Sequence, residues 1–302
     1  MHLLISFLII IVSSLISVAF YTMLERKMLG YIQIRKGPNK VGLMGIFQPF
    51  SDAMKLFSKS IFFSENMNFS ISAISPALIL ISSIIIWPLF PFAKQMLFDS
   101  KLSILSFFVI SSIMVFLIML IGWSANSKYC LIGAIRSVAQ MISYEVSMFL
   151  IVISSSILVY SFSFMSFPKF NHFPLMFILL PAFLMWLITC LAETNRSPFD
   201  FAEGESELVS GFNVEYMSGW FALIFLAEYM SMITLSFISS VLFISPMNTM
   251  TSFSPIIILS ITFLWIRGTF PRFRYDLLMN LNWKIFLPIS ISFFLFIWTL
   301  FH

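Results

Sequence analysis

Three glutamates lie within or at the end of strongly apolar segments, where water is scarce. Glu145 follows Arg136 by nine residues, which is about 13 Å along a helix. Glu228 lies at a comparable depth in a later segment, and Glu193 ends the segment between them. A charge at the bilayer centre costs at least ~2.5–3.5 kcal/mol, so such groups usually face a bundle interior or water. Because a poorly solvated carboxyl group also holds its proton more strongly, the pattern favours proton uptake and release.

Each of these glutamates, taken singly, could merely form a hydrogen bond to a neighbouring helix. Tyr144 and Tyr229 stand next to two of them in the chain and could extend a hydrogen-bonded series. We therefore predict a proton relay, which requires that the side chains face one another in the folded bundle.

The connection over residues 193–215 is unusually acidic, with only Arg196 as a basic residue. It could be a solvated loop with no further role. However, aromatic and small residues alternate with the acids, and a solubilising loop does not need a Pro198-Phe199 pair. We predict a folded lining for a cavity that opens inward, in which crowded acids stay partly protonated. The six acids are Glu193, Asp200, Glu203, Glu205, Glu207 and Glu215.

Two basic segments that contain glycine and proline lie in the first and seventh connections, which we expect on the same side of the membrane as the acidic connection. Residues 33–39 predict a turn, and residues 267–276 carry three arginines. Each segment alone could be a simple membrane anchor. Together with the acidic connection they suggest a docking surface for a protein, or walls around a polar ligand headgroup.

The composition requires a membrane. Of the 302 residues, 60% are apolar and 10% are charged, whereas soluble domains carry roughly 25% charged residues. Apolar runs of about 20 residues, enough to cross a bilayer, recur along the chain. This excludes soluble and disordered classes and predicts an all-α polytopic protein with a single membrane domain over residues 1–302. The eight expected spans are 3–24, 70–92, 102–123, 138–160, 174–192, 218–243, 254–270 and 285–301.

The chain offers few ligands for a redox centre. Cys130 and Cys190 lie far apart, and an iron–sulfur cluster needs about four cysteines. The histidines lie near the termini or in a loop. We therefore expect no metal and no redox cofactor on this chain.

Basic residues are distributed unevenly between the connections. Fourteen lie in the odd-numbered connections, and only Lys94, Lys101 and Lys169 lie in the even-numbered ones. The positive-inside rule then places the odd connections in the cytoplasm or mitochondrial matrix and both termini on the other side. The first apolar segment lacks a basic start and a cleavage site, so we expect a permanent helix rather than a signal peptide.

A second kind of helix is expected after the first span. Residues 46–61 place apolar side chains three and four positions apart, with polar residues on the opposite face. This is typical of a helix lying in the membrane interface, although a solvated tether is an alternative. The apolar stripe is Phe47, Phe50, Met54, Phe57 and Ile61.

Long blocks of the sequence resemble the chain 1 family of mitochondrial NADH–ubiquinone oxidoreductase, a membrane subunit of respiratory complex I. The resemblance covers essentially the whole chain, except for uninformative stretches at 94–101 and 161–173. The blocks that carry it are 25–39, 48–56, 136–145, 193–216, 227–229 and 267–284.

The resemblance implies a chamber for the ubiquinone headgroup next to the peripheral arm, with ubiquinone as substrate. We expect this quinone site at Arg26, Gln33, Arg35, Asp52, Arg196, Phe199, Asp200 and Arg274. We expect the proton path at Tyr144, Glu145, Glu193, Glu203, Glu205, Glu228 and Tyr229.

The same resemblance implies the surroundings of the chain. FMN, iron–sulfur clusters and NAD would be bound by partner subunits. The partners would be the peripheral-arm subunits of the quinone site and the small and antiporter-like membrane subunits, with no nucleic acid. The location would be the mitochondrial inner membrane, with odd connections in the matrix and both termini in the intermembrane space.

Three other functions remain open from the residues alone. An ion antiporter would also bury acids, but it should show inverted repeats with interrupted helices, and none is visible. A passive anchor for a soluble reductase would leave the buried glutamates without a role. The related subunit of membrane-bound hydrogenases would pump without quinone.

Overall fold

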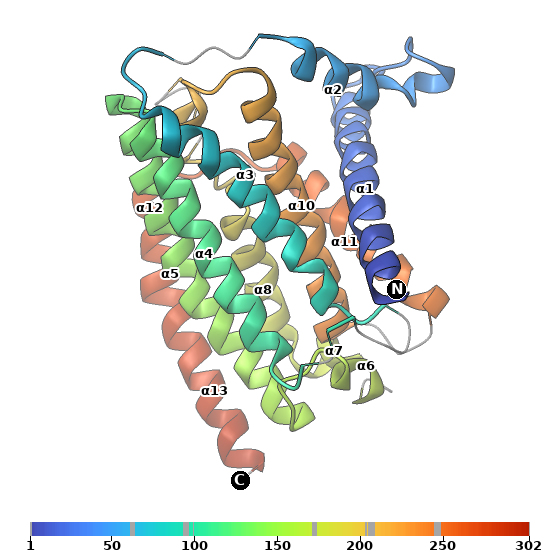
Figure 1. Cartoon of the computed structure of the whole chain (residues 1–302). Coiled ribbons are helices and arrows are strands. Elements are labelled where there is room, and N and C mark those ends of the chain that lie inside the picture. Colours follow the sequence, from blue (N-terminus) through green and yellow to red (C-terminus); the bar gives the residue numbers. More distant parts are fainter. Residues whose placement is uncertain are drawn as a thin grey trace.

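The computed structural model describes residues 2–60, 64–92, 97–98, 100–170, 174–202, 204, 209–244 and 249–301, which form a bundle of helices running up and down (Figure 1). The long helices are α1 (His2–Ile32), α3 (Phe69–Ile85), α4 (Ser103–Ser124), α5 (Lys128–Val159), α8 (Leu180–Glu193), α10 (Ser218–Phe243), α11 (Thr249–Thr269) and α13 (Leu287–Phe301). The short helices are α2 (Gln48–Ser58), α6 (Ser166–Phe170), α7 (Leu175–Ile178) and α12 (Tyr275–Leu281).

The predicted class of all-α polytopic membrane protein is confirmed. Six stretches among the described residues are long and apolar enough to cross a bilayer, and two more apolar helices are shorter. The number eight therefore stays a prediction. The six long stretches are Leu4–Ile32, Phe69–Leu89, Ser103–Ser124, Lys128–Val159, Ser218–Phe243 and Tyr275–Leu300, and the two shorter ones are Leu180–Glu193 and Phe253–Thr269.

Several helices differ from the predicted spans at their ends. α1 continues eight residues beyond the predicted end at residue 24, and α5 begins ten residues before the predicted start at 138. A helix satisfies its own backbone hydrogen bonds, so it can extend beyond the apolar run into the interface. The predicted span 174–192 is divided between α7 and α8 at Leu179, and Pro181 lies in the first turn of α8, where proline is well tolerated.

The last helix contains a π-helical turn over Asn282–Phe286, between α12 and α13. Pro288 follows this turn. A proline inside a helix has no N–H to donate and crowds the carbonyl four residues before it, and the wider π turn accommodates this. The buried Asn282 side chain then donates to the Ser143 carbonyl at 2.6 Å, which attaches the helix to α5.

Close packing around α5 brings the central elements together. α5 packs against α4, α8 and α13, and α10 packs against α3, α1 and α11. Gly122 of α4 lies so near Ala134 of α5 that a Cβ atom there would collide with it. A Cβ on Gly133 would lie 3.0 Å from the backbone nitrogen of Phe212. The small residues of α5 therefore allow α4 and the segment that leads to α10 to pack closely against it.

Both chain termini lie toward one end of the bundle, while α2 and the turn after α1 lie at the other (Figure 1). The predicted turn at 33–39 is confirmed: α1 ends at Ile32, and the Arg35 N–H donates to the Gly30 carbonyl at 2.8 Å. The predicted helix at 46–61 is confirmed as the shorter α2, Gln48–Ser58, whose Phe50 ring lies 6.2 Å from that of Phe20 in α1, while Ile61 of the predicted stripe lies outside the described residues. Its apolar side chains at Phe47, Met54 and Phe57 are exposed, as an interfacial helix requires.

Candidate functional site

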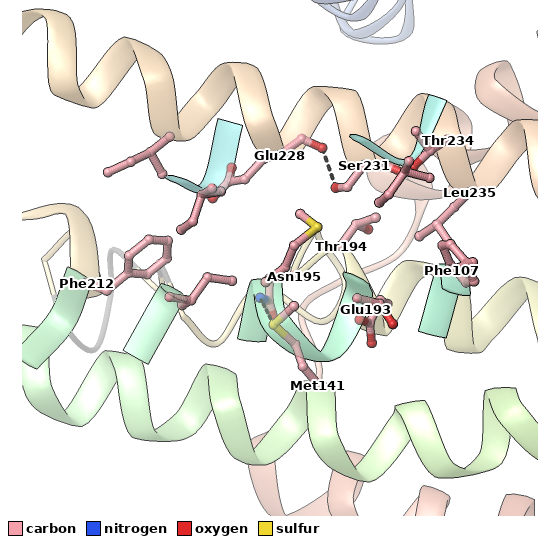
Figure 2. A pocket seen from close by; sticks show the side chains of 16 residues that line it. Phe107, Met141, Glu193, Thr194, Asn195, Phe212, Glu228, Ser231, Thr234 and Leu235 are labelled. Carbon is pink, nitrogen blue, oxygen red and sulfur yellow. Dashed lines mark hydrogen bonds between the residues drawn. The ribbon is translucent and has the colours of Figure 1, made fainter. Parts of the chain in front are cut away.

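A cavity of about 50 Å³ inside the bundle is shared by two of the predicted glutamates (Figure 2). Glu193 is the last residue of α8, and Glu228 lies in the first half of α10. One water molecule needs roughly 10–15 Å³ of such space, so the cavity has room for a few. Apolar side chains such as Met141 and Phe212 form much of the remaining lining.

Two polar atoms of the lining residues need such water. Glu193 Oε2 and Asn195 Oδ1 are buried and have no hydrogen-bond partner among the described residues. Buried polar atoms in proteins are nearly always hydrogen-bonded, and ordered water is the usual partner where protein groups do not suffice. The cavity is therefore suited to hold water in contact with a carboxyl group.

Glu145 is linked to the same cavity through a serine. Its Oε1 lies 2.9 Å from the Ser111 hydroxyl on α4, and Ser111 is one of the lining residues. Glu145 and Glu193 are also near enough to interact electrostatically. The structure thus brings the three predicted glutamates from α5, α8 and α10 to one place.

Glu228 is joined to a buried arginine. Arg196 Nη2 lies 3.1 Å from Glu228 Oε2, and the arginine side chain is only 6% exposed. The guanidinium group also lies over the Tyr229 ring, 4.5 Å from its centre, which is a favourable cation–π position. Arg196, Glu228 and Tyr229 therefore form one buried charged cluster beside the cavity.

Tyr144 points elsewhere. Its ring is completely buried, and its hydroxyl donates to the Leu278 carbonyl of α12 at 3.0 Å. It is not among the residues that line the cavity. Its place in the proton path stays a prediction.

A second buried ion pair was missed by sequence reasoning. Glu25 pairs with Arg267 of α11, and the Glu25 side chain is only 4% exposed. Ser14, Val18 and Tyr21, spaced three or four residues apart, are buried on the same face of α1. This face becomes visible only in the structure, because α1 is apolar on all sides and its sequence does not distinguish one face from another.

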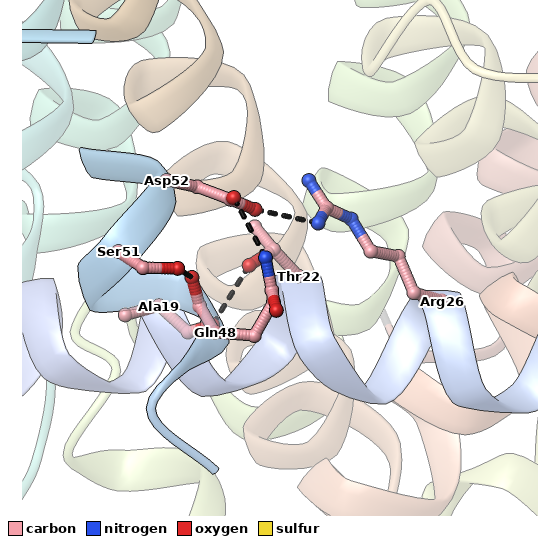
Figure 3. Close-up of polar contacts among 6 residues, drawn as sticks. All are labelled: Ala19, Thr22, Arg26, Gln48, Ser51 and Asp52. Atoms are coloured by element: carbon pink, nitrogen blue, oxygen red, sulfur yellow. Dashed lines mark hydrogen bonds and ion pairs between the residues drawn. The ribbon is translucent and has the colours of Figure 1, made fainter. Parts of the chain in front are cut away.

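At the end of the bundle opposite to the chain termini, Arg26 of α1 and Asp52 of α2 form an exposed ion pair of 2.6 Å (Figure 3). The Gln48 side chain donates to the other oxygen of Asp52 at 2.9 Å. Arg26 and Asp52, both predicted quinone-site residues, are thus brought together. Three others, Gln33, Arg35 and Arg274, are exposed and are not part of the contacts of that pair.

The basic segment after α11 packs on the acidic connection. Arg272 Nη2 lies 3.2 Å from Asp200 Oδ2, and the Phe273 N–H donates to the Pro198 carbonyl at 3.0 Å. The predicted quinone-site residue Phe199 is buried here, and its ring lies 5.5 Å from that of Phe273. The two segments therefore do meet. Two predicted members of the proton path, Glu203 and Glu205, lie outside the described residues.

Gln140 of α5 positions the start of this connection. Its side-chain N–H group donates to the Ala192 carbonyl at 2.8 Å and to the Phe199 carbonyl at 3.0 Å. One side chain therefore fixes both the end of α8, which carries Glu193, and the loop that carries Arg196.

Comparisons with known proteins agree over nearly the whole chain. A model of the NADH dehydrogenase family matches residues 5–298. NADH–ubiquinone oxidoreductase chain 1 of Aedes aegypti is 50% identical over 296 residues, covering 97% of this chain and 94% of that protein. The chain 1 proteins of Locusta migratoria (49% over 293 residues, 96% and 93% coverage) and Sarcophilus harrisii (46% over 298 residues, 95% and 93%) are similar as well. The chain therefore belongs to the NADH dehydrogenase family, as a membrane subunit of respiratory complex I of the chain 1 type.

Proposed function

We propose that this subunit helps to form the chamber for the ubiquinone headgroup and couples quinone reduction to proton movement through its buried glutamates. Ubiquinone is the substrate in this proposal, and FMN, iron–sulfur clusters and NAD are bound by partner subunits. Those partners are the peripheral-arm subunits of the quinone site and the small and antiporter-like membrane subunits. The observation that carries the proposal is the cavity that Glu193 and Glu228 share.

Negative charge that forms on the quinone headgroup during reduction can change how strongly these carboxyl groups hold their protons. Two unit charges 4 Å apart interact by about 4 kcal/mol at an effective dielectric constant of about 20. A quinone that gains electrons from the partner subunits becomes basic and takes up protons, so the nearest protonated carboxyl groups give protons to it and are reprotonated afterwards. Arg196 and Tyr229 link Glu228 to the connection that carries Asp200, which supports this route from the headgroup to the cavity.

The Ser111 hydroxyl can pass a proton between the cavity and Glu145. Its oxygen lies 2.9 Å from Glu145 and 2.9 Å from the Phe108 carbonyl. A hydroxyl group can donate one hydrogen bond and accept others. Glu145 therefore keeps this partner both when it is protonated and when it is ionised, which is what a proton-carrying group requires.

The quinone is proposed to enter from the bilayer past α1 and α2. Exposed aromatic residues of both helices, Phe20 and Phe50, meet there, and the Arg26–Asp52 pair lies one to two turns further along α1. The buried Glu25–Arg267 pair lies on the neighbouring face of the same helix end. An apolar entrance followed by fixed charges suits a molecule with an isoprenoid tail and a polar head.

Photo-crosslinking in the intact complex tests the quinone site. A ubiquinone analogue with a photoreactive headgroup is expected to label residues 20–26, residues 48–52 or the connection 193–204. Excess natural ubiquinone should suppress this labelling, whereas a short alcohol with the same photoreactive group should not produce it. Labelling confined to other subunits would remove the quinone chamber from this chain.

We further propose that this mitochondrial membrane protein lies in the inner membrane with its odd connections in the matrix. The turn at 33–39 and the end of α6 lie at opposite ends of the bundle (Figure 1). In mitoplasts, a membrane-impermeant maleimide should label Lys169→Cys directly. It should label Lys36→Cys only after the membrane is opened and the peripheral arm is released. Labelling of Lys36→Cys in sealed mitoplasts would reverse the orientation.

A further inference from the structure

A pocket of about 390 Å³ lies at the inner end of the bundle, separate from the carboxyl cavity and from the Arg26–Asp52 pair. It is formed where the end of α2 meets the start of α10. Its lining residues are Leu56, Lys59, Ser60, Tyr216, Met217, Ser218 and Phe221. None of these described lining residues is acidic, and Lys59 forms no ion pair with any described residue.

The start of α10 supplies hydrogen-bond donors to this pocket. The first N–H groups of any helix have no partner within the helix, and no side chain caps α10. They carry the positive end of the helix dipole, which attracts anions. α10 has 26 residues, so its dipole is well developed.

A buried hydroxyl group at the same place also has no partner. Ser218 lines the pocket and is 7% exposed, and its Oγ has no hydrogen-bond partner among the described residues. The neighbouring Tyr216 hydroxyl is already used, because it lies 2.8 Å from Ser124 Oγ and donates to the Ile121 carbonyl. Ser218 therefore remains as a side-chain donor for a ligand at this helix start.

The two helices are held together where the pocket forms. A Cβ atom on Gly219 would lie 3.4 Å from the Phe57 ring, so α2 packs directly on the first turn of α10. This contact holds the Lys59 backbone beside the uncapped end of α10. The pocket thus combines a cation, uncapped N–H groups and an unpartnered hydroxyl with the apolar side chains of Leu56, Met217 and Phe221.

We propose that this pocket binds the phosphate group of an anionic phospholipid from the inner leaflet. Its polar groups match a phosphate, and its apolar side chains match the glycerol and the first carbons of the acyl chains. Its place fits a lipid headgroup, because α10 is a membrane-spanning helix that begins there and α2 exposes an apolar face beside it. Inorganic phosphate carries the same kind of negative charge as the lipid headgroup but has no apolar part to contact these side chains.

The test uses the assembled complex in phosphatidylcholine nanodiscs that contain a small fraction of headgroup-photoreactive phosphatidylglycerol. Mass spectrometry should find labelled peptides at residues 56–60 and 216–221. Lys59→Gln should lower this labelling about fivefold, the factor that corresponds to ~1 kcal/mol per lysine near an anionic lipid. Ser218→Gly, which also suits the left-handed backbone of this residue, should lower it less.

Lys55→Gln is the matched control, because Lys55 is an exposed lysine one turn earlier on α2 and does not line the pocket. In Lys55→Gln, the lipid labelling of the pocket peptides should equal that of the unmodified complex, and Lys59→Arg should retain this labelling. Equal labelling in all variants, or an equal loss in Lys55→Gln, would overturn the proposal. Suppression by inorganic phosphate would assign the pocket to a free anion instead of a lipid. None of these readouts depends on quinone reduction.

Discussion

Glu193→Gln is expected to abolish coupled proton translocation and to lower the rate of ubiquinone reduction roughly 100-fold, at the low end of the effect of a positioned proton-transfer group. Glutamine keeps the shape of the side chain but cannot ionise. Glu193 forms no ion pair with a described residue, so the substitution leaves no opposite charge stranded. The assembled complex should therefore be present in near-normal amount, with its activity and pumping measured in proteoliposomes.

Glu65→Gln provides the control for this experiment. Glu65 is exposed in the connection before α3, so its neutralisation removes the same charge from the chain without touching the cavity. The Glu65→Gln complex should translocate protons and reduce ubiquinone at the same rates as the unmodified complex. Full proton stoichiometry in an assembled Glu193→Gln complex would exclude Glu193 from the path.

Arg196→Gln is expected to have the largest effect on stability. Removal of one partner of a buried ion pair typically costs about 3–5 kcal/mol, because the other charge loses an interaction that offsets its desolvation. Here the remaining charge is Glu228, inside a membrane-spanning helix. The complex should assemble poorly and melt at a lower temperature, as measured by its abundance on native gels and by thermal unfolding.

Two further variants separate this effect from a general loss of charge. Arg26→Gln breaks a shorter pair, but that pair is 54% and 34% exposed, so it should cost at most about 1 kcal/mol. Arg196→Gln combined with Glu228→Gln should recover part of the lost stability, since the double variant removes both charges of the pair. An Arg196→Gln complex as stable as Arg26→Gln would mean that Glu228 is not held as a buried ion.

The common level of the acids along the bundle could be predicted from the sequence, but the directions of their side chains could not. Counting residues from the basic connections placed Glu145, Glu193 and Glu228 at similar levels, and the structure brings them together. Neighbours on a helix, however, point about 100° apart. Glu145 therefore faces Ser111, whereas Tyr144, its neighbour, faces the Leu278 carbonyl.

The buried pairing between distant segments was the hardest feature to predict. Glu25 and Arg267 lie 242 residues apart in the sequence and belong to different helices. Each stands among other charged residues near a basic connection, so hydropathy places both at the end of an apolar segment. Only the burial of Ser14, Val18 and Tyr21 on the same face shows that this end of α1 packs inward.

Helix ends were predicted less well than helix positions, for a physical reason. Hydropathy reports the apolar run, whereas a helix ends where its backbone hydrogen bonds end. α5 therefore begins at Lys128, ahead of its apolar part. The break at Leu179 before α8 follows from local backbone geometry rather than from composition.

Infrared difference spectroscopy of the assembled complex, recorded between the resting state and the quinone-reducing state, tests the central claim most directly. If Glu193 changes its protonation during turnover, the difference spectrum contains a carboxylic acid C=O band that is absent in Glu193→Gln and present in Glu65→Gln. Identical difference spectra in the unmodified complex and in Glu193→Gln would contradict the account.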